Sequence, residues 1–211
     1  MPSIYELKPA FQNLLRPFVK KLYDMDITAN QVTLFAMFLS LALALFLYLY
    51  YLTHPPSLWL LLLPFWMLFR MAFNAIDGML AREFNQQSKL GAFYNELSDI
   101  ISDSALYLCF IAFGFIQPEL LLCITFLAIL SEYTGVMAPL IGEQRRYDGP
   151  MGKSDRAFGF GLLATIIVVM SYFPEQLSLF TYISNGLLII IGIMLIFTIY
   201  NRIKNSIHSK N

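Results

Sequence analysis

Six apolar stretches, each long enough to cross a lipid bilayer, set the first limit on the fold of this chain. They cover residues 31–52, 57–81, 92–115, 119–141, 157–173 and 180–200. Crossing a hydrocarbon core takes about twenty residues of α-helix, and in lipid only a helix or a closed barrel satisfies its own backbone hydrogen bonds. The chain has 58% hydrophobic residues and a mean hydropathy of +0.62, which is too apolar for a soluble domain. The sequence therefore predicts an all-α, polytopic integral membrane protein with six transmembrane helices.

Residues 1–25, which precede the first apolar stretch, form a mixed segment. Apolar residues recur in it at helical spacing, while its lysines fall on other sides of the helix. The apolar face is formed by Ile4, Leu7, Phe11, Leu14, Leu15, Phe18 and Leu22. This pattern predicts an amphipathic helix that lies on the membrane surface. We expect residues 1–211 to form a single domain, with the surface helix followed by a six-helix bundle over residues 31–205.

The positions of the basic residues predict the orientation of the chain. Lys and Arg occur before the first stretch, in the turns around residues 85 and 148, and after the last stretch; the other three connections contain none. Cytoplasmic loops carry an excess of Lys and Arg. Both termini and these two turns are therefore expected in the cytoplasm.

Oxygen-bearing side chains gather where the second and third apolar stretches meet. Asn74 and Asp77 are three residues apart, and Asn95, Asp99 and Asp103 are each four apart. Each set shares one face of a helix, and two helices joined by a short turn would bring these faces together. Such a cluster suits Mg²⁺, Mn²⁺ or Ca²⁺ rather than zinc. Ionisable residues at membrane depth thus predict a functional site that opens to the cytoplasm.

The cluster also allows two alternatives to a metal site. The carboxylates could lie at the level of the lipid headgroups and pair with Arg82 or Lys89. A transporter could also place carboxylates in the membrane, but transporters usually show paired repeats with broken helices. The sequence shows no such pair, which favours a site for binding or catalysis.

The cluster is part of a longer motif. The segment DGMLAR covers residues 77–82, eight residues separate it from Gly91, and seven more separate Gly91 from Asp99. This spacing resembles the CDP-alcohol phosphotransferase family, whose pattern is D-x-x-D-G-x-x-A-R-x8-G-x3-D-x3-D. The segment DITANQVTL before the first span is also similar to one that many members carry. The resemblance implies a phospholipid-synthesising enzyme that moves a phosphatidyl group from CDP-diacylglycerol, or a related CDP-linked donor, to an alcohol acceptor and releases CMP.

The resemblance also implies roles for the four motif positions. Divalent metal, Mg²⁺ or Mn²⁺, would be held by Asn74, Asp77 and Asn95, and Asp99 would be a further ligand and the general base. The family pattern has aspartate where this sequence has Asn74 and Asn95. An amide oxygen can bind a hard cation, but each substitution removes one negative charge. The sequence therefore leaves open whether the site holds one ion or two. It also leaves open a catalytically impaired family member that acts as a lipid- or nucleotide-binding or scaffolding membrane protein.

Small and basic residues around the motif would bind the CDP donor. Glycine and alanine let a nucleotide approach the backbone closely, although they also serve ordinary helix packing. Arg82 would contact a phosphate of the donor or hold a carboxylate. The predicted donor site consists of Asp77, Gly78, Ala81, Arg82 and Gly91.

A second basic group occupies the turn before the fifth apolar stretch. Family members that use phosphorylated acceptors bind the acceptor phosphate with basic residues in this region. The resemblance thus predicts an acceptor site for a small alcohol or alcohol phosphate, formed by Arg145, Arg146, Lys153 and Arg156. The alternative is a loop that sets topology beside anionic lipids.

Four further polar or sulfur-bearing residues fall inside the predicted spans. Arg70 and Glu132 are expected to form a buried ion pair. Cys109 and Cys123 are expected as small buried residues, not as a disulfide or metal site. The resemblance further implies a homodimer whose partners are the CDP-lipid, the acceptor and membrane lipids, with no nucleic acid.

Overall fold

The computed structural model describes residues 4–173, 175 and 177–208, with the side chains of residues 4–9 and Leu177 outside the description. The described residues form helices joined by turns, without a strand, which confirms the all-α prediction. The α-helices are α1 (Ile4–Asp24), α2 (Ala29–Tyr51), α3 (Leu62–Glu83), α4 (Lys89–Leu108), α5 (Pro118–Met137), α6 (Lys153–Met170) and α7 (Leu177–Ile207). Three short 3₁₀ segments, η1 (Leu58–Leu61), η2 (Cys109–Ala112) and η3 (Ala138–Ile141), adjoin α3, α4 and α5.

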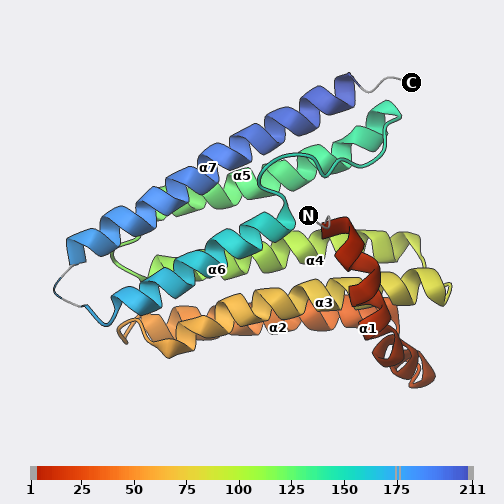
Figure 1. Ribbon diagram of the computed structural model, residues 1–211, viewed down its shortest axis with the longest axis horizontal. Coiled ribbons are helices and arrows are strands. Elements are labelled where there is room, and N and C mark those ends of the chain that lie inside the picture. Colours follow the sequence, from red (N-terminus) through yellow and green to blue (C-terminus); the bar gives the residue numbers. More distant parts are fainter. Residues whose placement is uncertain (1–3, 174, 176, 209–211) are drawn as a thin grey trace.

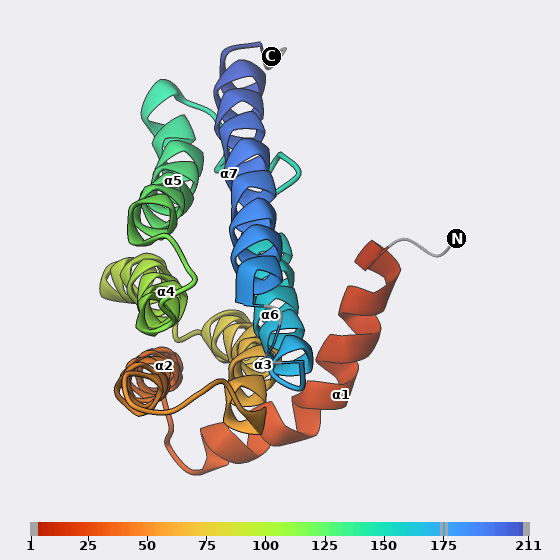
Figure 2. The ribbon, with the colours of Figure 1, turned by 90° about the vertical axis from the view of Figure 1, so that its left-hand side faces the viewer.

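Helices α2 to α7 run side by side, and α1 crosses one end of this bundle (Figures 1 and 2). Helix α2 packs on α3 and α4, α3 packs on α6, and α5 packs on α7. The core between them is apolar, and at its centre the ring of Tyr107 stacks on Phe160 with ring centroids 3.8 Å apart. The bundle therefore joins α4 to α6 through aromatic packing below the polar end of these helices.

Four helical segments of the described chain are long and apolar enough to cross a membrane. They are Ala29–Tyr51, Leu58–Glu83, Pro118–Ile141 and Ser178–Ile207. Helices α4 and α6 lie beside them but carry charged residues in their first turns or along their length. The six-span count thus stays a prediction that depends on α4 and α6.

Hydrogen bonds at the helix starts fix the polar end of the bundle. Thr28 caps α2, because its hydroxyl accepts from the Gln31 amide at 3.3 Å while the Gln31 side chain accepts from the Thr28 amide at 2.8 Å. Ser88 caps α4 by accepting from the Gly91 amide at 2.9 Å. The Gln86 side chain accepts from the backbone amide of Ala29 at 2.7 Å. These bonds tie the turn between α3 and α4 to the start of α2.

Helix α1 is attached to the end of α3. The Arg16 guanidinium lies 3.1 Å from the Glu83 carboxylate, and Tyr23 stacks on Phe84. Val19 is fully buried, whereas Leu14 is 75% exposed. Helix α1 thus has an apolar side on the bundle and another that faces outward.

That α1 lies on a membrane surface remains a prediction. The side chains of Ile4 and Leu7, which the sequence places on the apolar face, lie outside the described residues.

The two cysteines differ in their surroundings. Both are free; Cys109 is buried and Cys123 is exposed on α5. The expectation of a buried residue is therefore confirmed for Cys109 and wrong for Cys123. The Cys123 side chain therefore lies on the outer surface of the bundle.

Candidate active site

A cavity of about 1020 Å³ opens between α2, α3, α4 and the start of α6. It is lined by every residue that the sequence assigns to the metal and the CDP donor, and by two of the four assigned to the acceptor. These lining residues are Asn74, Asp77, Gly78, Ala81, Arg82, Gly91, Asn95, Asp99, Arg145 and Lys153. The predicted meeting of the two polar helix faces is thus present, and Arg146 and Arg156 lie outside the lining.

Asp77 is held by a residue that was not among the predicted site residues. Its side chain is buried, and its Oδ2 accepts a hydrogen bond from the Thr33 hydroxyl at 2.7 Å. Thr33 belongs to the segment DITANQVTL on α2, whose similarity to the family pattern was the one signal that pointed to it. The bond holds the Asp77 carboxylate in place at the cavity wall.

The glycines of the motif make room for polar side chains. A Cβ atom on Gly78 would lie 3.0 Å from two guanidinium nitrogens of Arg82, so Arg82 folds back across the helix over Gly78. A Cβ atom on Gly91 would lie 2.7 Å from the side-chain oxygen of Asn30 on α2. Gly78 thus lets the Arg82 guanidinium lie against α3 at the cavity wall.

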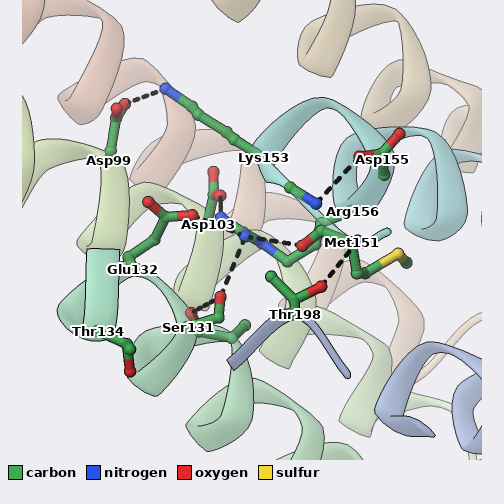
Figure 3. A network of polar contacts seen from close by, with 12 residues as sticks. Asp99, Asp103, Ser131, Glu132, Thr134, Met151, Lys153, Asp155, Arg156 and Thr198 are labelled. Atoms are coloured by element: carbon green, nitrogen blue, oxygen red, sulfur yellow. Dashed lines mark hydrogen bonds and ion pairs between the residues drawn. The ribbon is translucent and has the colours of Figure 1, made fainter. Parts of the chain in front are cut away.

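Asp99, the predicted base, is bound by two cations. Its Oδ1 lies 2.5 Å from the Lys153 ammonium (Figure 3). The same oxygen lies 3.2 Å from the Arg70 guanidinium. The Lys153 side chain is 30% exposed and the Arg70 side chain 6%. Lys153 therefore approaches Asp99 from the cavity, and Arg70 approaches it from inside the bundle.

A buried ionic network lies below Asp99. Asp103 forms ion pairs with Arg70 and with Arg156, the latter at 3.3 Å, and accepts a hydrogen bond from the Tyr107 hydroxyl at 3.2 Å. Arg156 also lies 2.8 Å from Glu132 (Figure 3). The network thus links α3, α4, α5 and α6 through alternating charges.

The predicted pairing of Arg70 with Glu132 is wrong. Arg70 pairs with Asp99 and Asp103, both on α4. Glu132 is instead reached by Arg156 of α6, because Asp103 occupies the place beside Arg70 that the prediction gave to Glu132. Asp103 was predicted only as a member of the oxygen cluster.

The basic turn between α5 and α6 divides into two parts. Arg145 forms an ion pair with Glu96 and lies 4.9 Å above the ring of Tyr147, so it stays at the cavity. Arg146 points the other way, donating to the backbone oxygen of Asn205 at 2.6 Å. The turn is therefore anchored to α7 on one side and faces the cavity on the other.

The anchor of this turn continues at Gly149, whose φ of +114° suits glycine. A Cβ atom there would lie 2.6 Å from the Cα atom of Thr198 on α7. The Thr198 hydroxyl accepts from the Met151 amide at 2.9 Å (Figure 3). Close contact with α7 thus fixes the position at which the turn leads into α6 at Lys153.

The oxygen set could hold a hard divalent cation. Asn74, Asp77 and Asn95 line the cavity together with Asp99, but the four side chains carry only two negative charges. Within residues 10–208 as described, no three His, Cys, Asp or Glu side chains form a group that could hold a metal. Carboxylate and amide oxygens are both ligands of hard cations, and a cation beside Asp99 would meet Lys153 and Arg70.

Comparison with known proteins decides the family. Residues 26–200 match the model of the CDP-alcohol phosphatidyltransferase family. The chain belongs to this family. The inner membrane protein YnbA of Escherichia coli K12 is 43% identical over 203 residues, which cover 96% of each chain. A protein of Aquifex aeolicus is 33% identical over 132 residues, covering 60% of this chain and 61% of its own.

Solved structures share the fold. Phosphatidylinositol phosphate synthase of Mycobacterium tuberculosis with manganese and citrate superimposes with a TM-score of 0.71 at 21% identity, covering 91% of this chain and 88% of that one. The same enzyme with CDP-DAG bound gives a TM-score of 0.68 at 21% identity, covering 91% and 92%. Family membership makes this CDP-alcohol phosphatidyltransferase a membrane-embedded transferase of phospholipid biosynthesis.

Proposed function

We propose that this protein transfers a phosphatidyl group from CDP-diacylglycerol, or a related CDP-linked donor, to the hydroxyl of a small alcohol or alcohol phosphate. One observation carries the proposal: a single cavity collects the whole donor motif, the oxygen set and Asp99. In the reaction, the acceptor oxygen attacks the lipid-side phosphorus, the phosphoanhydride bond breaks, and CMP leaves. Such a transfer needs neutralised phosphate charge, an aligned hydroxyl and a base.

The donor side is built on α3 and α4. We assign the pyrophosphate to the wall formed by Gly78, Ala81 and Gly91, where the Arg82 guanidinium lies over Gly78. The mycobacterial synthase, which shares this fold, has been solved with CDP-DAG bound and, in a separate structure, with manganese and citrate.

The bound ion would be Mg²⁺ or Mn²⁺. Asp77 would hold it together with the amide oxygens of Asn74 and Asn95. When bound, the ion supplies positive charge to the donor phosphates.

Asp99 is the proposed general base. Its carboxylate lines the cavity and is fixed from behind by Arg70. It would accept the proton of the attacking hydroxyl, which is its contribution to the transition state. Arg70 would thus act as a positioning residue, because it is buried and does not line the cavity.

The acceptor side is formed by the basic turn. Arg145 lines the cavity beside Tyr147 and is the residue of the turn that the structure favours for an acceptor phosphate or polar group. Arg146 and Arg156 hold the turn and the start of α6 in place through their bonds to α7 and α5. That Lys153 binds the acceptor stays a prediction, since its ammonium forms an ion pair with Asp99.

The proposed topology has six spans, because helices α4 and α6 would also cross the membrane. The cavity and both termini would face the cytoplasm, where the basic residues gather. The outward apolar side chains of the bundle would face lipid or, in a homodimer, a second copy.

The test is CMP release by the purified protein. Labelled CDP-diacylglycerol and Mg²⁺ or Mn²⁺ would be supplied with a panel of glycerol phosphate, inositol phosphate, serine, glycerol and choline. We expect CMP release that depends on one acceptor of the panel. Donor binding without CMP release on any acceptor would contradict the proposal and favour a lipid- or nucleotide-binding member.

A further inference from the structure

The oxygen set of this cavity carries less negative charge than two divalent ions require. Four aspartates would supply four negative charges, which balance two divalent cations, whereas Asn74 and Asn95 reduce the total to two. Hard cations respond strongly to ligand charge. This set therefore does not neutralise two divalent ions, and a second ion would add two uncompensated positive charges.

Protein cations already occupy the neighbourhood of Asp99. The Lys153 ammonium lies 2.5 Å from Asp99 Oδ1, within direct contact. The Arg70 guanidinium shares the same oxygen at 3.2 Å. An ion placed on Asp99 would have to displace Lys153 or accept its repulsion at short range.

Lys153 differs from Arg70 in facing the ligand space. Lys153 lines the cavity, and its side chain is 30% exposed; Arg70 is buried at 6% and is not among the lining residues. The backbone at Lys153 is fixed, because the Asp155 side chain accepts from the Gly152 amide at 3.0 Å in the first turn of α6. The ammonium is thus presented from a rigid helix start toward the space beside Asp99.

We propose that the Lys153 ammonium takes the place of one divalent cation, so that the site works with one metal ion and one lysine. The ion would lie on the Asn74 and Asp77 side, and the ammonium would meet the donor phosphate on the Asp99 side. Lys153 is then a donor-binding residue and not only the partner of Asp99. This inference rests on the proposed donor site, but its metal count can be measured without turnover.

The experiment counts bound Mn²⁺ by electron paramagnetic resonance during titration of the purified full-length protein in detergent, without substrate. We expect one Mn²⁺ per chain for the wild type. We expect two for a triple variant, Asn74→Asp, Asn95→Asp and Lys153→Met, with spin coupling between neighbouring ions. The triple variant also shows that the method can detect a second ion at this site.

Single variants test the lysine itself. A unit charge about 6 Å from a divalent ion changes its affinity roughly tenfold even at the dielectric constant of water, so Lys153→Met should bind Mn²⁺ at least about tenfold more tightly. Lys153→Arg keeps the charge and should behave like the wild type. Lys89→Met is the matched control, because Lys89 also lines the cavity and forms no ion pair within the described part of the chain; its effect should be smaller.

Three results would overturn the inference. They are two Mn²⁺ ions on the wild type, no bound ion on the wild type, or equal Mn²⁺ affinities for Lys153→Met and Lys89→Met. The wild-type count decides even where a variant fails to fold. One bound ion without CMP release would contradict the proposed function and leave this metal count intact.

Discussion

Replacing Glu132 with glutamine removes the negative charge that two buried arginines and the partly exposed Arg145 share. Glu132 lies 2.8 Å from Arg156 and 3.6 Å from Arg202, and both arginine side chains are about 2% exposed. Arg145 reaches its other oxygen at 3.4 Å. Glutamine keeps the shape of the side chain but leaves Arg202 without a carboxylate partner in the described structure.

The size of the effect follows from the charges that remain. Removing one partner of a buried ion pair costs about 3–5 kcal/mol. Arg156 keeps Asp103 at 3.3 Å, so we expect the lower end, about 3 kcal/mol. For a chain of about 200 residues, each kcal/mol shifts the midpoint of thermal unfolding by roughly 2–4 °C, which predicts a loss of roughly 6–12 °C.

Thermal unfolding in one detergent, with the wild type measured alongside, gives the comparison. The matched control is Glu119→Gln, since Glu119 is an exposed acid in the first turn of the same helix. It should change the midpoint by no more than roughly 1 °C, as expected of a surface charge. Equal midpoints for Glu132→Gln and Glu119→Gln would refute the view that this network stabilises the bundle.

Three further variants test the site and the packing of the basic turn beside it. Asp99→Asn should lower the rate of CMP release at least about a hundredfold while donor binding changes little, because a base contributes about 10² or more in the transition state; undiminished release would rule out Asp99 as the base. Gly135→Ala should destabilise the folded protein by about 1–3 kcal/mol, since the added Cβ would lie 2.5 Å from a backbone oxygen of the basic turn. Gly186→Ala is the control and should leave stability unchanged, because its Cβ meets nothing within 4 Å. Equal unfolding midpoints for the two variants would contradict this reasoning. Arg145→Gln should raise the KM for a phosphorylated acceptor roughly tenfold or more and leave the donor KM nearly unchanged; an equal rise in both would place Arg145 in the donor site.

The helices and the oxygen cluster were predictable because both depend on local spacing. Apolar runs of about twenty residues mark the helices, and separations of three and four residues place Asn74 and Asp77, or Asn95 and Asp99, on one face. The short turn between α3 and α4 then leaves little freedom in how these faces meet. The cavity lining confirms that meeting.

The pairing of the buried charges could not be predicted in the same way. Several acids lay within reach of Arg70, and the choice of Asp103 over Glu132 depends on how α3, α4, α5 and α6 pack. Thr33 donates a hydrogen bond to Asp77, and Arg202 forms an ion pair with Glu132. In both cases the two residues are far apart in the sequence. For Thr33 the one signal was its place in the segment DITANQVTL, and no local pattern marks Arg202.

Release of CMP from CDP-diacylglycerol by the purified wild type tests the central claim most directly. With Mg²⁺ or Mn²⁺ and the acceptor panel, we expect CMP and a new phospholipid in equal amounts. We expect the Asp99→Asn variant, at the same protein concentration, to form both products at least about a hundredfold more slowly. Absence of CMP from wild-type protein that still binds the donor, or equal release by the variant, would contradict the assignment of this cavity as the site of phosphatidyl transfer.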